Sequence, residues 1–242
     1  MPHLFVNRPR LYDLTGDDRD LRRQFRWETL NAVSYKLGGV IFVVGSILFF
    51  PALSAYADLG AWAFTIGSLL YLLVTSHDLV EALRYRHRQE GAPSIWDRME
   101  LQAAVAYSFG SVLFVVGSVF FLSYVGLAYA GAWCFVLGSL VFVYGATINV
   151  LQITQAKSVI TLQLMNFTAL TFVTGSVLFT VASIPYLWTF ADSVDERRTD
   201  AFLAWQFVAG SVLFLAGGVF NYWRAYLFVR NKVSEQASAP AR

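Results

Sequence analysis

The sequence has few charged residues and a single cysteine. Asp, Glu, Lys and Arg make up 14% of its 242 residues, against roughly 25% in an ordinary soluble domain. No charged residue occurs between Glu100 and Lys157, so this stretch cannot present the usual water-facing surface. The lone Cys134 excludes a disulfide within the chain and any CxxC metal or redox motif. Most of the chain is therefore not a soluble domain.

Ionisable residues are also missing from the middle of every long apolar stretch. Such residues normally mark ion or proton paths through a membrane, so a proton-coupled transporter or a carboxylate ion site is not expected. His3, His77 and His87 are scattered, and no combination of residues resembles a nucleophile with its base, a carboxylate pair or a metal triad. His77 and Glu81, one helical turn apart, supply two metal ligands at best. We expect no enzymatic activity, no cofactor and no metal.

What the sequence does contain is apolar: 57% of its residues are hydrophobic. A helix of about 20 apolar residues can cross a bilayer. Proline lies at the end of the first and fifth such stretches, at Pro51 and Pro185, where it ends a helix. The stretches cover residues 30–50, 62–83, 101–122, 130–151, 164–187 and 201–228. The sequence therefore predicts an all-α polytopic membrane protein with six transmembrane helices.

Small residues recur seven positions apart in each stretch. Seven residues make about two helical turns, so both small residues lie on one face, where another helix can approach closely. Serines beside them can bond to the carbonyl four residues earlier or to a neighbouring helix. We predict close helix packing along these faces; the alternative is a hydroxyl-lined pore or ligand groove. The predicted packing residues are Gly38, Gly45, Ser46, Gly67, Ser68, Gly110, Gly117, Ser118, Gly138, Ser139, Gly175, Ser176, Gly210, Ser211 and Gly217.

The stretches alternate between two sequence patterns. The odd ones share Gly-x-Val-(Ile/Leu)-Phe, starting at Gly38, Gly110 and Gly175, and the even ones share Ala-Trp-x-Phe-x-x-Gly-Ser. The repeating unit is thus a helical hairpin of about 70 residues, present three times. The predicted organisation is an N-terminal segment (1–29), a first hairpin (30–83), a basic loop (84–99), a second hairpin (100–152), a third hairpin (160–229) and a C-terminal tail (230–242).

The charges outside the stretches predict an orientation. All 18 Lys and Arg residues except Arg197 and Arg198 lie on the side of the two termini, so the termini are expected to be cytoplasmic. Trp62, Trp133 and Trp205 then enter from the outer side, where indole rings favour the headgroup region. A basic cluster on the inner side, Arg84, Arg86 and Arg88, is expected to attract anionic headgroups. Nucleic-acid binding is not expected.

These patterns resemble a known family. The strings GxxFxxGSxxF and AWxFxxGS, with the preceding Trp27-Glu28-Thr29-Leu30-Asn31, are similar to the YrhK-like domain, a small bacterial two-span membrane module. The resemblance covers residues 27–83 and 100–152, and more weakly 163–228, where Ala182 replaces a glycine. It implies a fold and a membrane location, and it transfers no catalytic residue.

Two functions are carried forward. The first is a structural or interaction module of the bacterial inner membrane, which contacts lipids and assembles through its glycine faces as a homo-oligomer or with a membrane-protein partner. The second is a channel or carrier for a neutral or apolar small solute.

Several finer expectations concern solvent and the segments between helices. Phe side chains are expected to face lipid, and Asn149 and Asn221 are expected to meet water at the helix ends. The polar segment 192–200 is expected to be a solvated connector, with Thr199 or Asp200 capping the sixth helix. Residues 17–26 are expected to be either an interfacial helix or disordered.

Overall fold

The computed structural model describes residues 18–88, 91–156, 158–189 and 192–238, and among them it contains only helices. Three short 3-10 segments accompany the α-helices, at Pro51–Tyr56, Ile153–Gln155 and Ile184–Leu187. The α-helices are α1 (Asp18–Leu48), α2 (Ala57–Arg88), α3 (Ile95–Phe120), α4 (Ala128–Gln152), α5 (Val159–Ser183) and α6 (Ser193–Ser238).

In the part of the chain that the structure describes, six helical segments are long and apolar enough to cross a membrane. This confirms the predicted all-α class with six spans. The segments are Thr29–Leu48, Pro51–His87, Ile95–Phe120, Ala128–Gln152, Val159–Leu187 and Ser193–Leu227.

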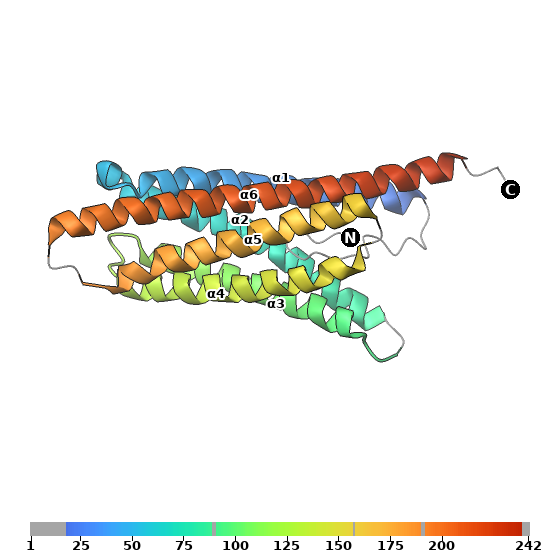
Figure 1. Ribbon diagram of the computed structural model, residues 1–242, viewed down its shortest axis with the longest axis horizontal. Helices are drawn as coiled ribbons and strands as arrows, with labels where there is room; N and C mark the ends of the chain where they lie inside the picture. The colour runs from blue at the N-terminus through green and yellow to red at the C-terminus, as the bar shows by residue number, and fades with distance from the viewer. Residues whose placement is uncertain (1–17, 89–90, 157, 190–191, 239–242) are drawn as a thin grey trace.

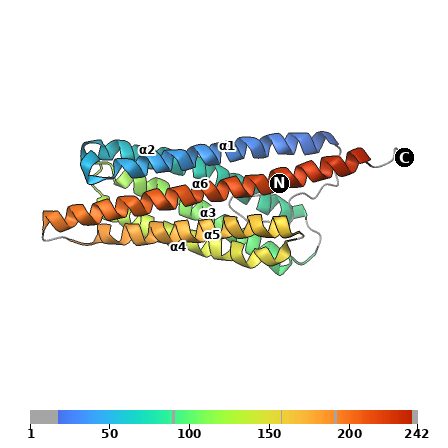
Figure 2. The same cartoon turned by 45° about the horizontal axis from the view of Figure 1, so that its top comes forward.

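The helices form a closed ring. Each packs against its neighbours in the chain, and α6 also packs against α1. The helices run along the long axis of the molecule, and α1 begins at the end where α6 finishes (Figures 1 and 2). We call this the terminal end, and the opposite end, with the short segments Pro51–Tyr56 and Ile184–Leu187, the far end. A ring is the natural solution for a chain whose helices all carry one packing face, because closure leaves no such face uncovered.

Local sequence signals set the helix ends. Ser94 starts α3 with a capping box, in which its hydroxyl accepts from the Asp97 backbone N–H and the Asp97 carboxylate accepts from the Ser94 backbone N–H. The Ser158 hydroxyl caps α5 by accepting from the Thr161 backbone N–H. Pro51 and Pro185 follow the ends of α1 and α5 as expected.

The polar segment 192–200 is solvent-exposed over residues 192–198, as expected, but it is helical from Ser193 and not a connector. Helix α6 begins at Ser193, and the Asp192 carboxylate accepts a 3.0 Å hydrogen bond from the Val194 backbone N–H. Asp195 and Glu196 lie in the first turn, where acidic side chains favour the positive end of the helix dipole. The cap is therefore Asp192 and not Thr199 or Asp200. At its other end α6 continues to Ser238, through most of the segment expected as a tail.

Aromatic side chains fill the axis of the ring, contrary to the expectation that Phe faces lipid. The rings of Phe64 and Phe179 lie 6.2 Å apart between centroids, although α2 and α5 are not neighbours in the ring. Rings in the protein interior fill volume and gain edge-to-face contacts with each other that a lipid chain does not offer. The same five positions of each hairpin supply this aromatic column: Tyr35, Tyr107 and Phe172; Phe42, Phe114 and Phe179; Phe49, Phe121 and Tyr186; Phe64, Phe135 and Phe207; Tyr71, Phe142 and Phe214.

Glycines on the facing helices make room for these rings. A Cβ atom at Gly110 would lie 2.6 Å from Cδ2 of Phe142, and one at Gly210 would lie 2.6 Å from Cδ2 of Phe179. The backbones also come close, since a Cβ atom at Gly138 would lie 3.3 Å from the Gly110 carbonyl oxygen. The aromatic stripe of each helix therefore meshes with the glycine stripe of its hairpin partner.

Gly117→Ala tests this meshing. In an isolated helix alanine is more favourable than glycine by about 1 kcal/mol. Here its Cβ would meet Cδ2 of Phe135 at 2.7 Å and Cβ of Cys134 at 2.9 Å, and overpacking of this kind costs about 1–3 kcal/mol. We expect a lower thermal unfolding temperature in detergent. The exposed Val116→Ala on the same turn is the control, and a Gly117→Ala protein more stable than wild type would contradict the meshing.

Candidate functional site

The axis-facing stripes end in polar residues at the terminal end. Each even helix has a glycine at the same place of its repeat, namely Gly67, Gly138 and Gly210. The residue four positions after it is aromatic (Tyr71, Phe142 and Phe214), and the residue eleven positions after it is polar (Asp78, Asn149 and Asn221). On the odd helices the corresponding stripe ends at Glu100 in α3 and at Met165 in α5. Three residues further along the even helices, the aligned side chains are Glu81, Gln152 and Arg224. We define the polar layer as the buried members of this set: Asp78, Glu100, Asn149, Gln152, Asn221 and Arg224.

The polar layer is sealed inside the protein. Asn149 is 0% and Asn221 is 1% exposed, so the expectation that water reaches them at the helix ends is wrong. The charged members are equally enclosed: Asp78 is 1%, Glu100 4% and Arg224 2% exposed. The reason is that each helix packs against both of its neighbours in the ring, so the stripes that carry these residues are enclosed.

One hydrogen bond joins the polar layer to the aromatic column, and a second joins two helices within the column. The Asn149 amide donates to the Tyr107 hydroxyl at 2.9 Å, joining α4 to α3. The Tyr35 hydroxyl donates to the Phe214 carbonyl at 2.8 Å, joining α1 to α6. Tyr35 and Tyr107 thus have hydrogen-bond partners for their hydroxyls, as buried hydroxyl groups require.

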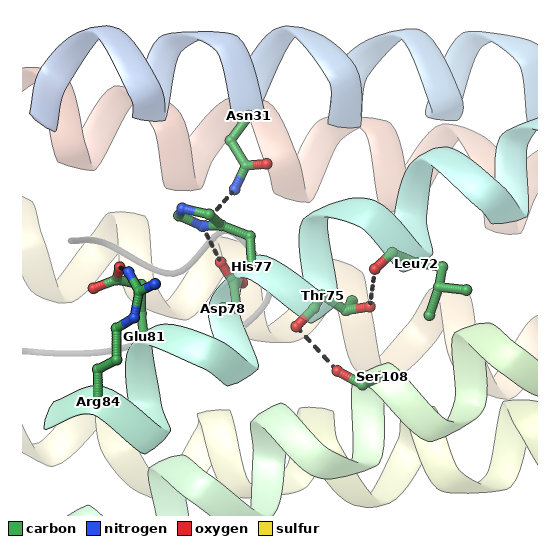
Figure 3. Close-up of polar contacts among 8 residues, drawn as sticks. All are labelled: Asn31, Leu72, Thr75, His77, Asp78, Glu81, Arg84 and Ser108. Carbon is green, nitrogen blue, oxygen red and sulfur yellow. Dashed lines mark hydrogen bonds and ion pairs between the residues drawn. The ribbon is translucent and has the colours of Figure 1, made fainter. Parts of the chain in front are cut away.

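Side chains at the edge of the layer link α1, α2 and α3 (Figure 3). The Asn31 amide lies 3.3 Å from Nδ1 of His77, and the same nitrogen lies 4.0 Å from the Asp78 carboxylate. In α3, the Ser108 hydroxyl donates to the Thr75 carbonyl at 3.0 Å.

His77 and Glu81 contact different residues, His77 lying against Asn31 and Asp78 and Glu81 against Arg84. Glu81 lies 3.5 Å from the Arg84 guanidinium, on the part-exposed side of α2 (Figure 3). The described residues contain no group of three His, Cys, Asp or Glu side chains placed to hold a metal.

The six predicted packing serines are all buried, and the hydroxyls of four of them make hydrogen bonds, in two ways. Ser46, Ser118 and Ser176 donate to the carbonyl four residues earlier, at 2.6–2.7 Å. Ser46 also lies 3.2 Å from Ser211, hydroxyl to hydroxyl, which connects the first hairpin to the third.

Ser68 and Ser139 differ, because their hydroxyls have no hydrogen-bond partner in the described part of the chain. Ser68 lines a cavity of about 20 Å³ inside the aromatic column, together with Ser111 and six aromatic rings. Such a volume holds about one water molecule.

The predicted packing glycines contact helices of their own chain. Gly38 and Gly67 face each other across the first hairpin, where a Cβ at either would lie 3.3 Å from the other's carbonyl oxygen. Gly175 and Gly210 do the same in the third, at 3.2 Å. Gly45 faces Phe64, and Gly217 faces Phe172.

The predicted surface residues lie apart from the polar layer. Trp62, Trp133 and Trp205 are exposed near the far end of the even helices, and their anchoring in headgroups stays a prediction. Arg84 and Arg86 are exposed at the end of α2, whereas the Arg88 side chain lies outside the described part of the structure.

Sequence reasoning missed the polar layer because it weighed each polar residue alone. The available signal was the repeat itself: eleven residues after the aligned glycines Gly67, Gly138 and Gly210 stand Asp78, Asn149 and Asn221. One polar residue at the same position in every hairpin indicates a shared environment.

Comparison with known proteins identifies part of the chain. Residues 25–83 and 97–153 each match the family model described as YrhK-like protein. The two matches are the first and second hairpins, and both confirm the predicted resemblance in tandem. No curated protein and no solved structure matches the chain.

Tyr107→Phe tests the bond between the polar layer and the column. Phenylalanine fits the site, since Phe172 occupies the equivalent position of the third hairpin. Without the hydroxyl, the buried Asn149 amide loses a partner, which costs about 1 kcal/mol. We expect Tyr107→Phe to unfold at a lower temperature than wild type, as measured by tryptophan fluorescence during heating. Tyr144→Phe, at an exposed tyrosine, is the control; equal stability of the two variants would show that this bond is not needed.

Proposed function

We propose that the chain, in which two YrhK-like domains stand in tandem ahead of a third hairpin, is a non-enzymatic structural and interaction module of the bacterial cytoplasmic membrane. The observation that carries this proposal is the aromatic column. A ring of six helices whose axis is occupied by meshed aromatic side chains is a rigid body and not an open passage.

The glycine faces assemble the three hairpins of one chain. This is supported by their contacts, which run to the helices of the same ring. A homo-oligomer or a complex with a membrane-protein partner would then use the outer surface, which is rich in exposed Leu, Val and Ile. Lipids cover that surface where no partner does.

The alternative is a channel or carrier for a neutral or apolar small solute. A pore needs its hydroxyl groups turned to a common, water-filled axis. Three observations favour the module: the serines at positions 46, 118 and 176 bond to helix carbonyls, the cavity at Ser68 holds about one water, and aromatic rings surround it.

Two series of variants separate these functions. In the module, replacing Gly45, Gly117 and Gly138 by Leu forces the meshed helices apart and unfolds the protein or dissociates its assembly, seen as a loss of the monodisperse peak in size-exclusion chromatography. Replacing Ser46, Ser118 and Ser139 by Ala leaves assembly intact and, because no solute passes, leaves the swelling rate of liposomes in glycerol at the rate of empty ones. Swelling faster than in empty liposomes, lost in the Ser→Ala series, would establish the alternative.

We also propose that both termini are cytoplasmic, on the strength of the basic residues that gather at the terminal end. In a Cys134→Ser background, Tyr124→Cys at the far end should react with a membrane-impermeant maleimide in cells with a permeable outer membrane. Arg86→Cys, at the terminal end, should react only after lysis. Both native side chains are exposed, so the opposite labelling pattern would reverse the orientation.

A further inference from the structure

The charges of the polar layer are divided unequally among the three hairpins. The carboxylates come from the first two, with Asp78 on α2 and Glu100 on α3, and the guanidinium comes from the third, with Arg224 on α6. At the positions equivalent to Arg224 the other hairpins carry Glu81 and Gln152. Among the residues whose burial the structure describes, Arg224 of the third hairpin, which the family model does not match, is therefore the one buried basic side chain.

The stripes that carry these groups converge on one axis. The residue one heptad before Asp78 is Tyr71, and the residue one heptad before Asn221 is Phe214. In this part of the column, rings from helices that are not neighbours in the ring come together: Phe142 of α4 and Phe214 of α6 lie 5.9 Å apart, and Tyr107 of α3 and Phe172 of α5 lie 6.4 Å apart. Because a residue seven positions further on lies on the same helix face, the next positions of the same stripes face the same axis.

The burial of Arg224 places its side chain in the interior at the terminal end, with the rest of the polar layer. Arg224 lies one helical turn beyond Asn221, near the end of the apolar span at Leu227, and is 2% exposed, although an arginine at the end of a membrane span normally extends outward to water or headgroups. Its guanidinium is therefore held between the helices, at the end of the ring where Asp78 and Glu100 are also enclosed.

Enclosed charges of one sign are strongly unfavourable. A carboxylate taken out of water costs several kcal/mol unless an opposite charge and hydrogen bonds compensate. A buried arginine beside buried carboxylates compensates both sides at once, and its planar fork of five donors suits carboxylate oxygens.

We infer that Arg224 is the internal counter-charge of the polar layer and neutralises the carboxylates of Asp78 and Glu100. The third hairpin thus has a task that the others lack: it supplies the cation that allows two acidic hairpins to close into a ring with it. The three hairpins are not interchangeable, because a ring built from copies of the first or second alone would enclose carboxylates without a counter-charge.

The repeats themselves supply the substitutions that test this inference. Arg224→Gln places there the residue of the second hairpin, and Asp78→Asn places the residue of the second and third. With Glu100→Gln, these changes remove charge with little change in size. Thermal unfolding of the full chain in detergent, followed by tryptophan fluorescence, measures the single, double and triple variants. Arg224→Lys keeps the positive charge but removes the planar guanidinium with its five N–H donors.

Arg224→Gln should lower the unfolding temperature by roughly 10 °C, as expected when a buried charge pair loses one partner. Arg224→Lys should lose less. Combining Arg224→Gln with Asp78→Asn and Glu100→Gln should recover at least half of the loss, because no charge is then left without its partner.

Two results would overturn the inference: an unchanged unfolding temperature in Arg224→Gln, or a triple variant as unstable as Arg224→Gln alone. If Arg224→Gln does not fold at all, the triple variant tests the inference. A folded triple variant supports the pairing of Arg224 with the two carboxylates, and an unfolded one contradicts it. Glu81→Gln is the matched control at the equivalent, part-exposed position, where we expect no change.

Discussion

The structure depends on the meshing of glycine with aromatic side chains inside each hairpin. Within a membrane, apolar side chains gain nothing by leaving lipid for protein, so helices associate where their shapes fit closely. Here a ring on one helix occupies the space that a missing side chain leaves on the next, as Phe142 does over Gly110 and Phe179 over Gly210. Odd and even helices both carry aromatic side chains and glycines, so within each hairpin the aromatic side chains of either helix pack on the glycines of the other. Three such hairpins close around a common axis.

This meshing decides what the rest of the molecule can do. With rings on the axis, the serine hydroxyls turn to helix carbonyls or to one another, as in the contact between Ser46 and Ser211. The polar residues gather at one end, where the aromatic stripe stops. The three hairpins differ there: the equivalent positions carry Glu81, Gln152 and Arg224, so at this position only the third hairpin has a positive charge.

Sequence alone predicted the six spans, the repeat and the helical class, because length, apolar composition and spacing determine them. It could not predict which apolar residues face inward. Phe and Leu are equally at home in lipid, so a hydrophobic pattern gives no contrast between the two faces of a membrane helix. For the same reason Asn149 and Asn221 were assigned to water: their burial depends on helices distant in the sequence. The polar segment 192–200 was expected to be a connector and is helical from Ser193, because acidic residues suit both a loop and the first turn of a helix.

The closed ring is the central claim, and one cross-link tests it most directly. Ser46 on α1 and Ser211 on α6 join the first hairpin to the last, with their hydroxyls 3.2 Å apart. In a Cys134→Ala background, Ser46→Cys together with Ser211→Cys should form a disulfide within one chain under mild oxidation in native membranes, seen as a shifted monomer on a non-reducing gel. Absence of a disulfide, or one formed only between two chains, would contradict closure of the ring by a single chain.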